Sequence, residues 1–132
     1  MRKELVITTS SKNEFVDITK KVEVFLKETN GEDGIITIFV PHTTAAVTIN
    51  ENADPDVKND MIQALNRMIP EKEKYKHLEG NSPAHIKASV LGMSEIVLVH
   101  QGSLVLGTWQ GIYFCEFDGP RKRKIIMDIK SS

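Results

Sequence analysis

The strongest constraint on the fold is Gly34–Val40 (GIITIFV), a stretch that is almost continuously apolar and rich in β-branched side chains. Such residues favour β-strands, and an apolar run without alternation is typical of a strand inside a sheet. A second β-rich stretch, Ala45–Asn50, follows after a short polar break. The sequence therefore predicts two core strands joined by a turn, and this turn contains Pro41 and His42.

The rest of the chain mixes β-rich stretches with three helical patterns and lacks a regular strand–helix–strand repeat. This order predicts the α+β class, with a mostly antiparallel sheet and a few helices packed on it, in a single domain over residues 1–132. Further strands are expected at Glu4–Thr9, Glu14–Ile18 (able to pair with the first as a hairpin), Glu95–His100, Leu104–Leu106, Ile112–Phe117 and Arg121–Ile129. Helices are expected to begin at the capping residues Thr19, Asp54 and Ser82 and to end at Asn30-Gly31, Pro70 and Gly92.

Composition excludes several classes of protein. The chain of 132 residues has a formal net charge of −1, so no overall field attracts nucleic acid or an anionic membrane. No stretch approaches the ~18 consecutive apolar residues of a membrane-spanning helix. Cys115 is the only cysteine, which rules out an intramolecular disulfide and fits a reducing compartment. We therefore expect a soluble cytoplasmic protein with neither nucleic acid nor membrane as a partner.

Three of the four histidines, His42, His77 and His85, lie in turns or helix starts with polar neighbours. Three neutral imidazoles often hold zinc and leave a fourth position for water or substrate. Their spacing matches no standard zinc motif, and on spacing alone three surface or capping histidines are the stronger interpretation. Glu51, beside a helix start, has no evident structural role. A carboxylate near an imidazole can orient that histidine or act as a base.

Two segments near the C-terminus also carry candidate chemistry. Gly107–Gly111 (GTWQG) combines backbone freedom with Trp109, a stacking surface, and Gln110, which can both donate and accept hydrogen bonds. The segment suits a planar heterocycle, although a bulged hairpin with a core tryptophan explains it equally well. In the cationic run Arg121–Lys124, the guanidinium of Arg121 can bind phosphate bidentately. The alternative for this run is a charged edge strand that resists aggregation.

Several short blocks of sequence follow one another in a fixed order along nearly the whole chain. They are PHTTAA (41–46), NENADP (50–55), YKH (75–77), AHIKA (84–88), LG (91–92), GTWQGI (107–112) and EFDGPR (116–121). Each block alone is weak evidence, but together they are specific. The chain resembles the YjbQ-like family, whose members are often described as secondary thiamine-phosphate synthases.

The resemblance implies a compact α+β fold that assembles as a homotrimer, with sites near the subunit boundaries. It also implies that His42, His77 and His85 bind a metal or an anion. The implied cofactor is a divalent metal, either zinc or Mg²⁺ that accompanies the substrate. The implied reaction joins a hydroxymethylpyrimidine diphosphate to a thiazole phosphate and gives thiamine phosphate and pyrophosphate.

In this hypothesis the chain is an enzyme with a small phosphorylated substrate. The alternative is a non-catalytic module that binds a phosphorylated metabolite or a partner protein. The residues expected to be catalytic are His42 and Glu51, and those expected to bind the substrate are Thr43, Thr44, Asn81, Trp109, Gln110 and Arg121.

Overall fold

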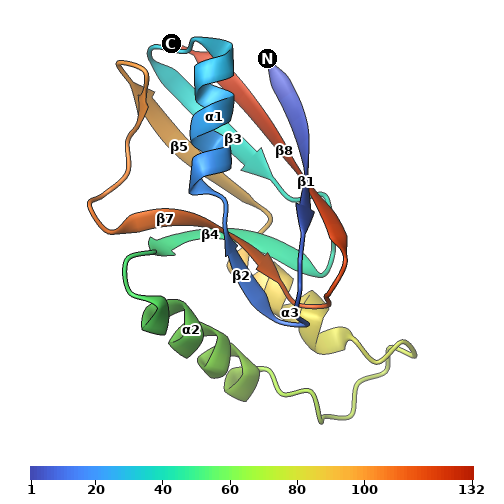
Figure 1. Ribbon diagram of the computed structural model, residues 1–132. Coiled ribbons are helices and arrows are strands. Elements are labelled where there is room, and N and C mark those ends of the chain that lie inside the picture. The colour runs from blue at the N-terminus through green and yellow to red at the C-terminus, as the bar shows by residue number, and fades with distance from the viewer.

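The computed structural model describes residues 1–132 as two antiparallel β-sheets and three helices (Figure 1). In chain order the elements are β1 (Arg2–Thr8), β2 (Glu14–Asp17), α1 (Thr19–Thr29), β3 (Gly34–Phe39), β4 (Ala45–Glu51), α2 (Pro55–Met68), α3 (Ser82–Leu91), β5 (Ser94–His100), β6 (Ser103–Leu104), β7 (Gln110–Glu116) and β8 (Lys122–Ser131). The α+β class expected from the sequence is confirmed.

The larger sheet has the strand order β1-β8-β3-β5-β6. Its inner strand β3 pairs with β5 on one side and with β8 on the other, so that Ile36 lies opposite both Val97 and Ile129. The apolar run therefore forms an inner strand, as its composition predicts. β8 lies between β1 and β3, but its cationic start, Lys122–Lys124, pairs only with β1 and extends past the end of β3.

The smaller sheet, β2-β7-β4, is buried on both faces. One face packs against α1 and the larger sheet, and α2 and α3 cover the other face (Figure 1). The strand between the other two, β7, is consequently buried from Gly111 to Glu116. This arrangement explains why β7 is apolar along its length instead of alternating. The first core contains Val22, Phe25, Ile36, Ile38, Val47, Phe114, Ile125 and Met127; the second contains Phe15, Ala46, Leu65, Ala84, Ala88, Tyr113, Cys115 and Phe117.

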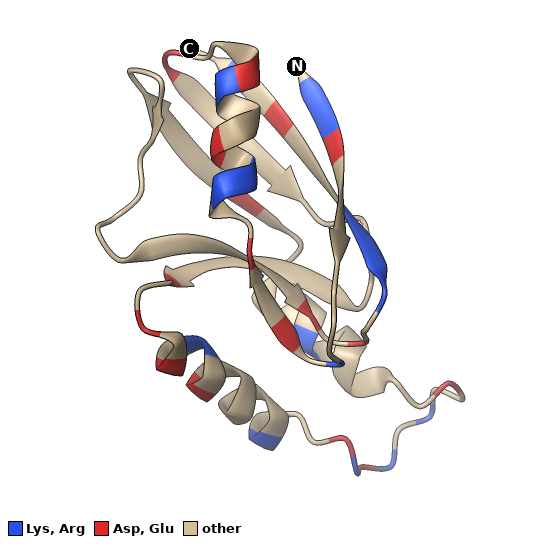
Figure 2. Cartoon of the chain, in the orientation of Figure 1, with Lys and Arg blue, Asp and Glu red and all other residues tan.

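The outer face of the larger sheet has no helix over it. Phe39 on β3 and Ile96 and Leu98 on β5 are 45%, 60% and 55% exposed, whereas the intervening Val97 is buried. In Figure 2, β3 is tan along its whole length, because it contains no Lys, Arg, Asp or Glu. A single chain therefore leaves an apolar strip of this sheet in contact with water, which is unusual for an isolated domain.

Two helix ends follow directly from the local sequence. The carboxylate of Asp54 accepts a hydrogen bond from the backbone N–H of Asp56 (2.9 Å), and Pro55 occupies the first helical position of α2. Asn30 ends α1 in the left-handed conformation (φ 55°). None of the three helices has the length and apolar character that a membrane-spanning helix needs.

Three expectations about local structure are wrong. β2 pairs with β7 and not with β1, because a hydrophobic pattern identifies a strand but not its partner. Thr19 and Ser82 are the first helical residues rather than caps. The cap position of α3 is Asn81, whose side chain donates to Asp118 instead of capping the helix. Of the two interpretations of Gly107–Gly111, the bulged hairpin with a core tryptophan is excluded, because Trp109 is 63% exposed.

Truncation of Ile38 tests the central packing. Its side chain is fully buried in β3, so Ile38→Ala should lower the free energy of unfolding by about 2–5 kcal/mol through lost burial and a cavity. Val90 is 62% exposed on α3, and Val90→Ala should change it by no more than about 0.5 kcal/mol. Urea denaturation of both variants measures the difference, and equal losses would contradict this account of the core.

Candidate functional site

An open pocket of about 740 Å³ lies where the β3–β4 turn, the start of α3 and the β7–β8 turn meet. The three histidines expected to bind a metal all line it, together with four of the residues expected to bind substrate. The polar and charged side chains of the lining are His42, Thr43, Thr44, His77, Glu79, Asn81, His85, Asp118, Arg121 and Arg123.

A buried ion pair fixes one side of this pocket. Glu116 and Arg123 are 0% and 3% exposed, and their carboxylate and guanidinium are joined through both Nε (2.8 Å) and Nη2 of the arginine. Nη2 of Arg123 also donates to Oγ1 of Thr44 (2.8 Å). Glu116 accepts two further hydrogen bonds, from the Thr9 hydroxyl (2.8 Å) and from the Asp118 backbone N–H (3.0 Å). The pair thereby ties the β3–β4 turn to β1, β7 and β8.

The imidazole of His42 is anchored by the backbone of β8. Its Nε2 accepts a hydrogen bond from the N–H of Lys124 (2.9 Å). Nδ1 has no partner within the chain and is accessible. Burial lowers the pKa of His42, and the nearby charge of Arg123 lowers it further. The N–H of Lys124 acts in the same direction, because it can bond only to an unprotonated Nε2.

His77 and His85 contact each other across the mouth of the pocket. Their rings are packed edge to face, with centroids 5.3 Å apart and planes at 88°. No group of three or more His, Cys, Asp or Glu side chains is placed so that it could hold a metal ion. Since Nε2 of His42 is already engaged by Lys124, the donor set does not fit a zinc centre with three histidine ligands in this arrangement.

Asn81, Asp118 and Arg121 form a second polar group in the pocket. Asp118 Oδ2 accepts from Nδ2 of Asn81 (2.9 Å) and from Nη2 of Arg121 (3.1 Å). Because the carboxylate fixes the orientation of the Asn81 amide, the amide oxygen Oδ1 is left buried without a hydrogen-bond partner. The side chain of Arg121 remains 50% exposed. This group therefore offers a ligand the cation of Arg121, whereas the unpaired Asn81 oxygen is buried.

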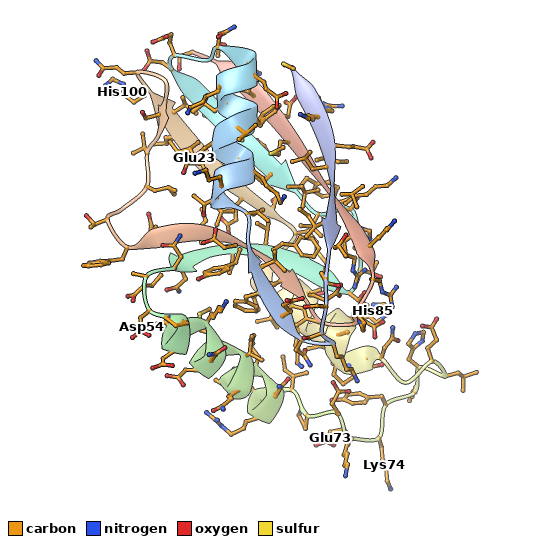
Figure 3. All side chains as sticks on the ribbon, viewed as in Figure 1. Glu23, Asp54, Glu73, Lys74, His85 and His100 are labelled. Carbon is orange, nitrogen blue, oxygen red and sulfur yellow. The ribbon has the colours of Figure 1, made fainter.

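The other expected site residues lie elsewhere in the chain. β4 begins beside the pocket and ends at Glu51, which pairs with Gln110 of β7. A strand of seven residues spans roughly 20 Å, so Glu51, Gln110 and the exposed Trp109 lie at the far end of the smaller sheet. Figure 3 shows His85 and Asp54, which follows β4, on opposite sides of the molecule. Within one chain, these three residues are not brought to the histidines.

Glu79 and Arg123 line the pocket although no motif marks them. The sequence does contain a signal for Arg123. In a strand, every second side chain faces the same side, and Arg123 therefore faces the same side as the apolar Ile125 and Met127. All three side chains are buried on one face of β8. Strand alternation thus separates Arg123 from its exposed neighbours Lys122 and Lys124.

A profile of the family described as UPF0047 protein YjbQ-like matches residues 3–132 of the chain. The chain belongs to the YjbQ family. It is 56% identical over 124 residues to the UPF0047 protein YugU of Bacillus subtilis, covering 93% of this chain and 94% of that protein. A UPF0047 protein of Methanocaldococcus jannaschii is 51% identical over 123 residues, covering 93% and 89% of the two chains.

Solved structures of the YjbQ family share this fold. A crystal structure of the YjbQ/UPF0047 protein from Clostridium acetobutylicum has a TM-score of 0.95 and 51% identity, covering 97% of this chain and 99% of that one. The YbjQ-like protein of Sulfolobus solfataricus, described as being of unknown function, has a TM-score of 0.96 and 33% identity, covering 100% and 97%. The two sheets and three helices are therefore those of the YjbQ family.

Acidification tests the buried ion pair. Burial alone would raise the pKa of Glu116, but the hydrogen bonds from Arg123, the Asp118 N–H and Thr9 outweigh it and hold the pKa below the ordinary 4.5. The ionised carboxylate therefore stabilises the fold above pH 4.5, and this stability is lost as the pH falls through the lowered pKa.

The matched variant is Glu116→Gln, which leaves the Arg123 guanidinium buried without a counter-charge. At pH 7 it should cost about 3–5 kcal/mol of unfolding free energy in urea denaturation. The difference between wild type and variant should shrink as the pH falls below 4.5, and it should be lost once the pH passes the lowered pKa, where the folded wild-type carboxyl also becomes neutral. A difference that stays constant down to pH 3 would show that the charge of Glu116 is unimportant.

Proposed function

We propose that the protein is a transferase that binds phosphorylated substrates in the pocket around His42, His85 and Arg121, with an activity like that of thiamine-phosphate synthase. The observation that carries the proposal is the convergence of these side chains, from two turns and a helix start, on one open pocket. Membership of the YjbQ family supports it, because members of this family are often described as secondary thiamine-phosphate synthases.

The pocket has the donors that a phosphate group needs. Arg121 is half exposed, and Arg123 uses Nε and Nη2 within the chain and leaves Nη1 for a ligand. The hydroxyls of Thr43 and Thr44 line the same wall. Guanidinium and hydroxyl donors of this kind bind phosphate oxygens with charge-assisted hydrogen bonds.

The proposed reaction displaces pyrophosphate at an activated methylene carbon. The ring nitrogen of the thiazole attacks that carbon, a C–N bond forms, and the C–O bond to the diphosphate breaks, so that pyrophosphate leaves with the electron pair. Negative charge grows on the departing oxygen, where Arg121 and the neutral His42 would stabilise it. Mg²⁺ that enters bound to the diphosphate would need no imidazole ligand, since it prefers phosphate oxygens.

We also propose that the protein works as a trimer. Phe39 lines the pocket and at the same time belongs to the uncovered apolar face that includes Ile96 and Leu98. A second copy seated on this face would therefore border the pocket. Closed cyclic assembly satisfies every such face. Glu51, Trp109 and Gln110 would then serve the pocket of a neighbouring copy, with Trp109 and Gln110 on the heterocycle.

One observation favours a second candidate, a non-catalytic module that binds a phosphorylated metabolite. Both arginines of the pocket are already paired with carboxylates, Arg121 with Asp118 and Arg123 with Glu116. Such pairing limits the charge available for a transition state while it still permits binding. Pyrophosphate release from the two thiamine precursors distinguishes the candidates, because a binding module would show saturable binding without turnover.

Removal of Arg121 tests the phosphate site. Arg121→Ala should weaken binding of the pyrimidine diphosphate about tenfold or more, since a hydrogen bond to a charged group is lost. The melting temperature should change little at this half-exposed position. Lys122→Ala removes an equal charge from an exposed residue outside the pocket and should bind normally. If Arg121→Ala and Lys122→Ala behave alike in calorimetric titration, the phosphate site is misplaced.

A charge on the uncovered face tests the assembly. Light scattering of the wild type should give three times the mass of one chain. Ile96→Asp should give monomers, because burying an unpaired carboxylate between apolar faces is costly. Val90→Asp, a comparable change at an exposed position of α3, should remain trimeric. A wild type that is monomeric at micromolar concentration would refute the proposed trimer.

A further inference from the structure

His42 lies where β8 continues past the end of β3. The last residue of β3, Phe39, is paired with Ile126 of β8. Lys124, two residues earlier on β8, has Val6 of β1 as its neighbour on one side and no β3 residue on the other. Its N–H donates to Nε2 of His42 instead (2.9 Å). The imidazole thus takes the place of the next strand residue in the sheet.

This hydrogen bond determines the tautomer of the ring. A backbone N–H can only donate, so Nε2 must carry a lone pair, and a neutral imidazole then has its proton on Nδ1. We infer that His42 is held as the Nδ1–H tautomer and offers this N–H to an oxyanion in the pocket, and that it is not a metal ligand. The inference rests on the proposed phosphate-binding function and assigns His42 its role within it.

The surroundings of Nδ1 fit a donor to an anion. Nδ1 has no hydrogen-bond partner in the chain, and His42 lines the same pocket as Arg121 and Arg123. Burial and the charge of Arg123 lower the pKa of His42, so the ring acts as a neutral donor beside two cations. An oxyanion can therefore accept from the ring and the guanidinium groups together without any protonation of the histidine.

A metal ion finds no lone pair on this ring. Nε2 is engaged by Lys124, and Nδ1 carries the proton, so coordination would require the hydrogen bond to Lys124 to break. Of the three histidines, His77 and His85 remain as possible ligands, and no group of three or more His, Cys, Asp or Glu side chains is placed to hold a metal ion. The three histidines that suggest zinc in the sequence thus have different roles in the fold. His42 is a hydrogen-bond donor, and His77 and His85 pack against each other.

Two substitutions separate the two ring nitrogens. The amide of glutamine reaches about as far as Nε2, so His42→Gln keeps an acceptor for Lys124 and removes the donor at the position of Nδ1. The amide of asparagine lies near Nδ1, so His42→Asn keeps the donor and removes the acceptor. The probes are inorganic phosphate and Zn²⁺ alone, titrated into the full chain.

We expect His42→Gln to melt like the wild type but to bind inorganic phosphate about tenfold more weakly. His42→Asn should melt earlier and bind phosphate within about threefold of the wild type. In the ¹⁵N-histidine spectrum of the wild type, couplings to ring protons should identify Nδ1–H, and Zn²⁺ should leave the His42 signals in place.

An Nε2–H tautomer, or His42 signals that move with stoichiometric Zn²⁺, would overturn the inference even if phosphate binds and the proposed function stands. Unchanged phosphate affinity in His42→Gln would overturn it as well. If the tautomer is Nδ1–H but the wild type binds no phosphate, the oxyanion role is overturned together with the proposed function. The spectrum of the wild type decides the tautomer even where a variant fails to fold.

Discussion

The structure around the pocket depends on the buried ion pair of Glu116 and Arg123. Removing two charges from water is expensive, and such a pair is tolerated only when the remaining donors and acceptors are satisfied. Here the carboxylate accepts from Thr9 and from the backbone of the β7–β8 turn, and the guanidinium bonds to Thr44. Apolar residues would fill the same space without directional bonds. The ion pair instead fixes how two turns meet, and these two turns carry His42 and Arg121.

The double burial of the smaller sheet determines where chemistry can occur. Because β7 is covered on both faces, polar side chains can collect only at its two ends. One end forms the pocket with the histidines, and the other carries Glu51, Gln110 and Trp109. The larger sheet has the opposite property, since one of its faces is apolar and open. The proposed trimer depends on these two features, an open apolar face beside the pocket and polar residues at the far end that lie outside it.

Local structure was predictable from the sequence wherever a residue acts on its immediate neighbours. The cap at Asp54, the stop at Asn30 and the inner position of β3 depend on side chains within a few residues. The partner of β2 was not predictable. β2 pairs with β7, which lies about 100 residues later in the chain, and this pairing depends on how the whole core packs and not on neighbouring residues. Arg121 and Arg123 look alike in a run of cations, yet one is half exposed and the other is buried.

The role of the histidines shows the same limit in its clearest form. A sequence pattern can indicate that three imidazoles share one pocket, but it does not indicate which ring nitrogens have lone pairs that face the ligand. For His42 that is decided by one backbone N–H, donated from a residue 82 positions away. This N–H is free because β3 ends at Phe39 while its neighbour β8 continues. If β3 extended two residues further, Lys124 would bond to it, and either ring nitrogen of His42 could carry the lone pair that binds a metal. The length of one strand thus separates an oxyanion donor from a metal ligand.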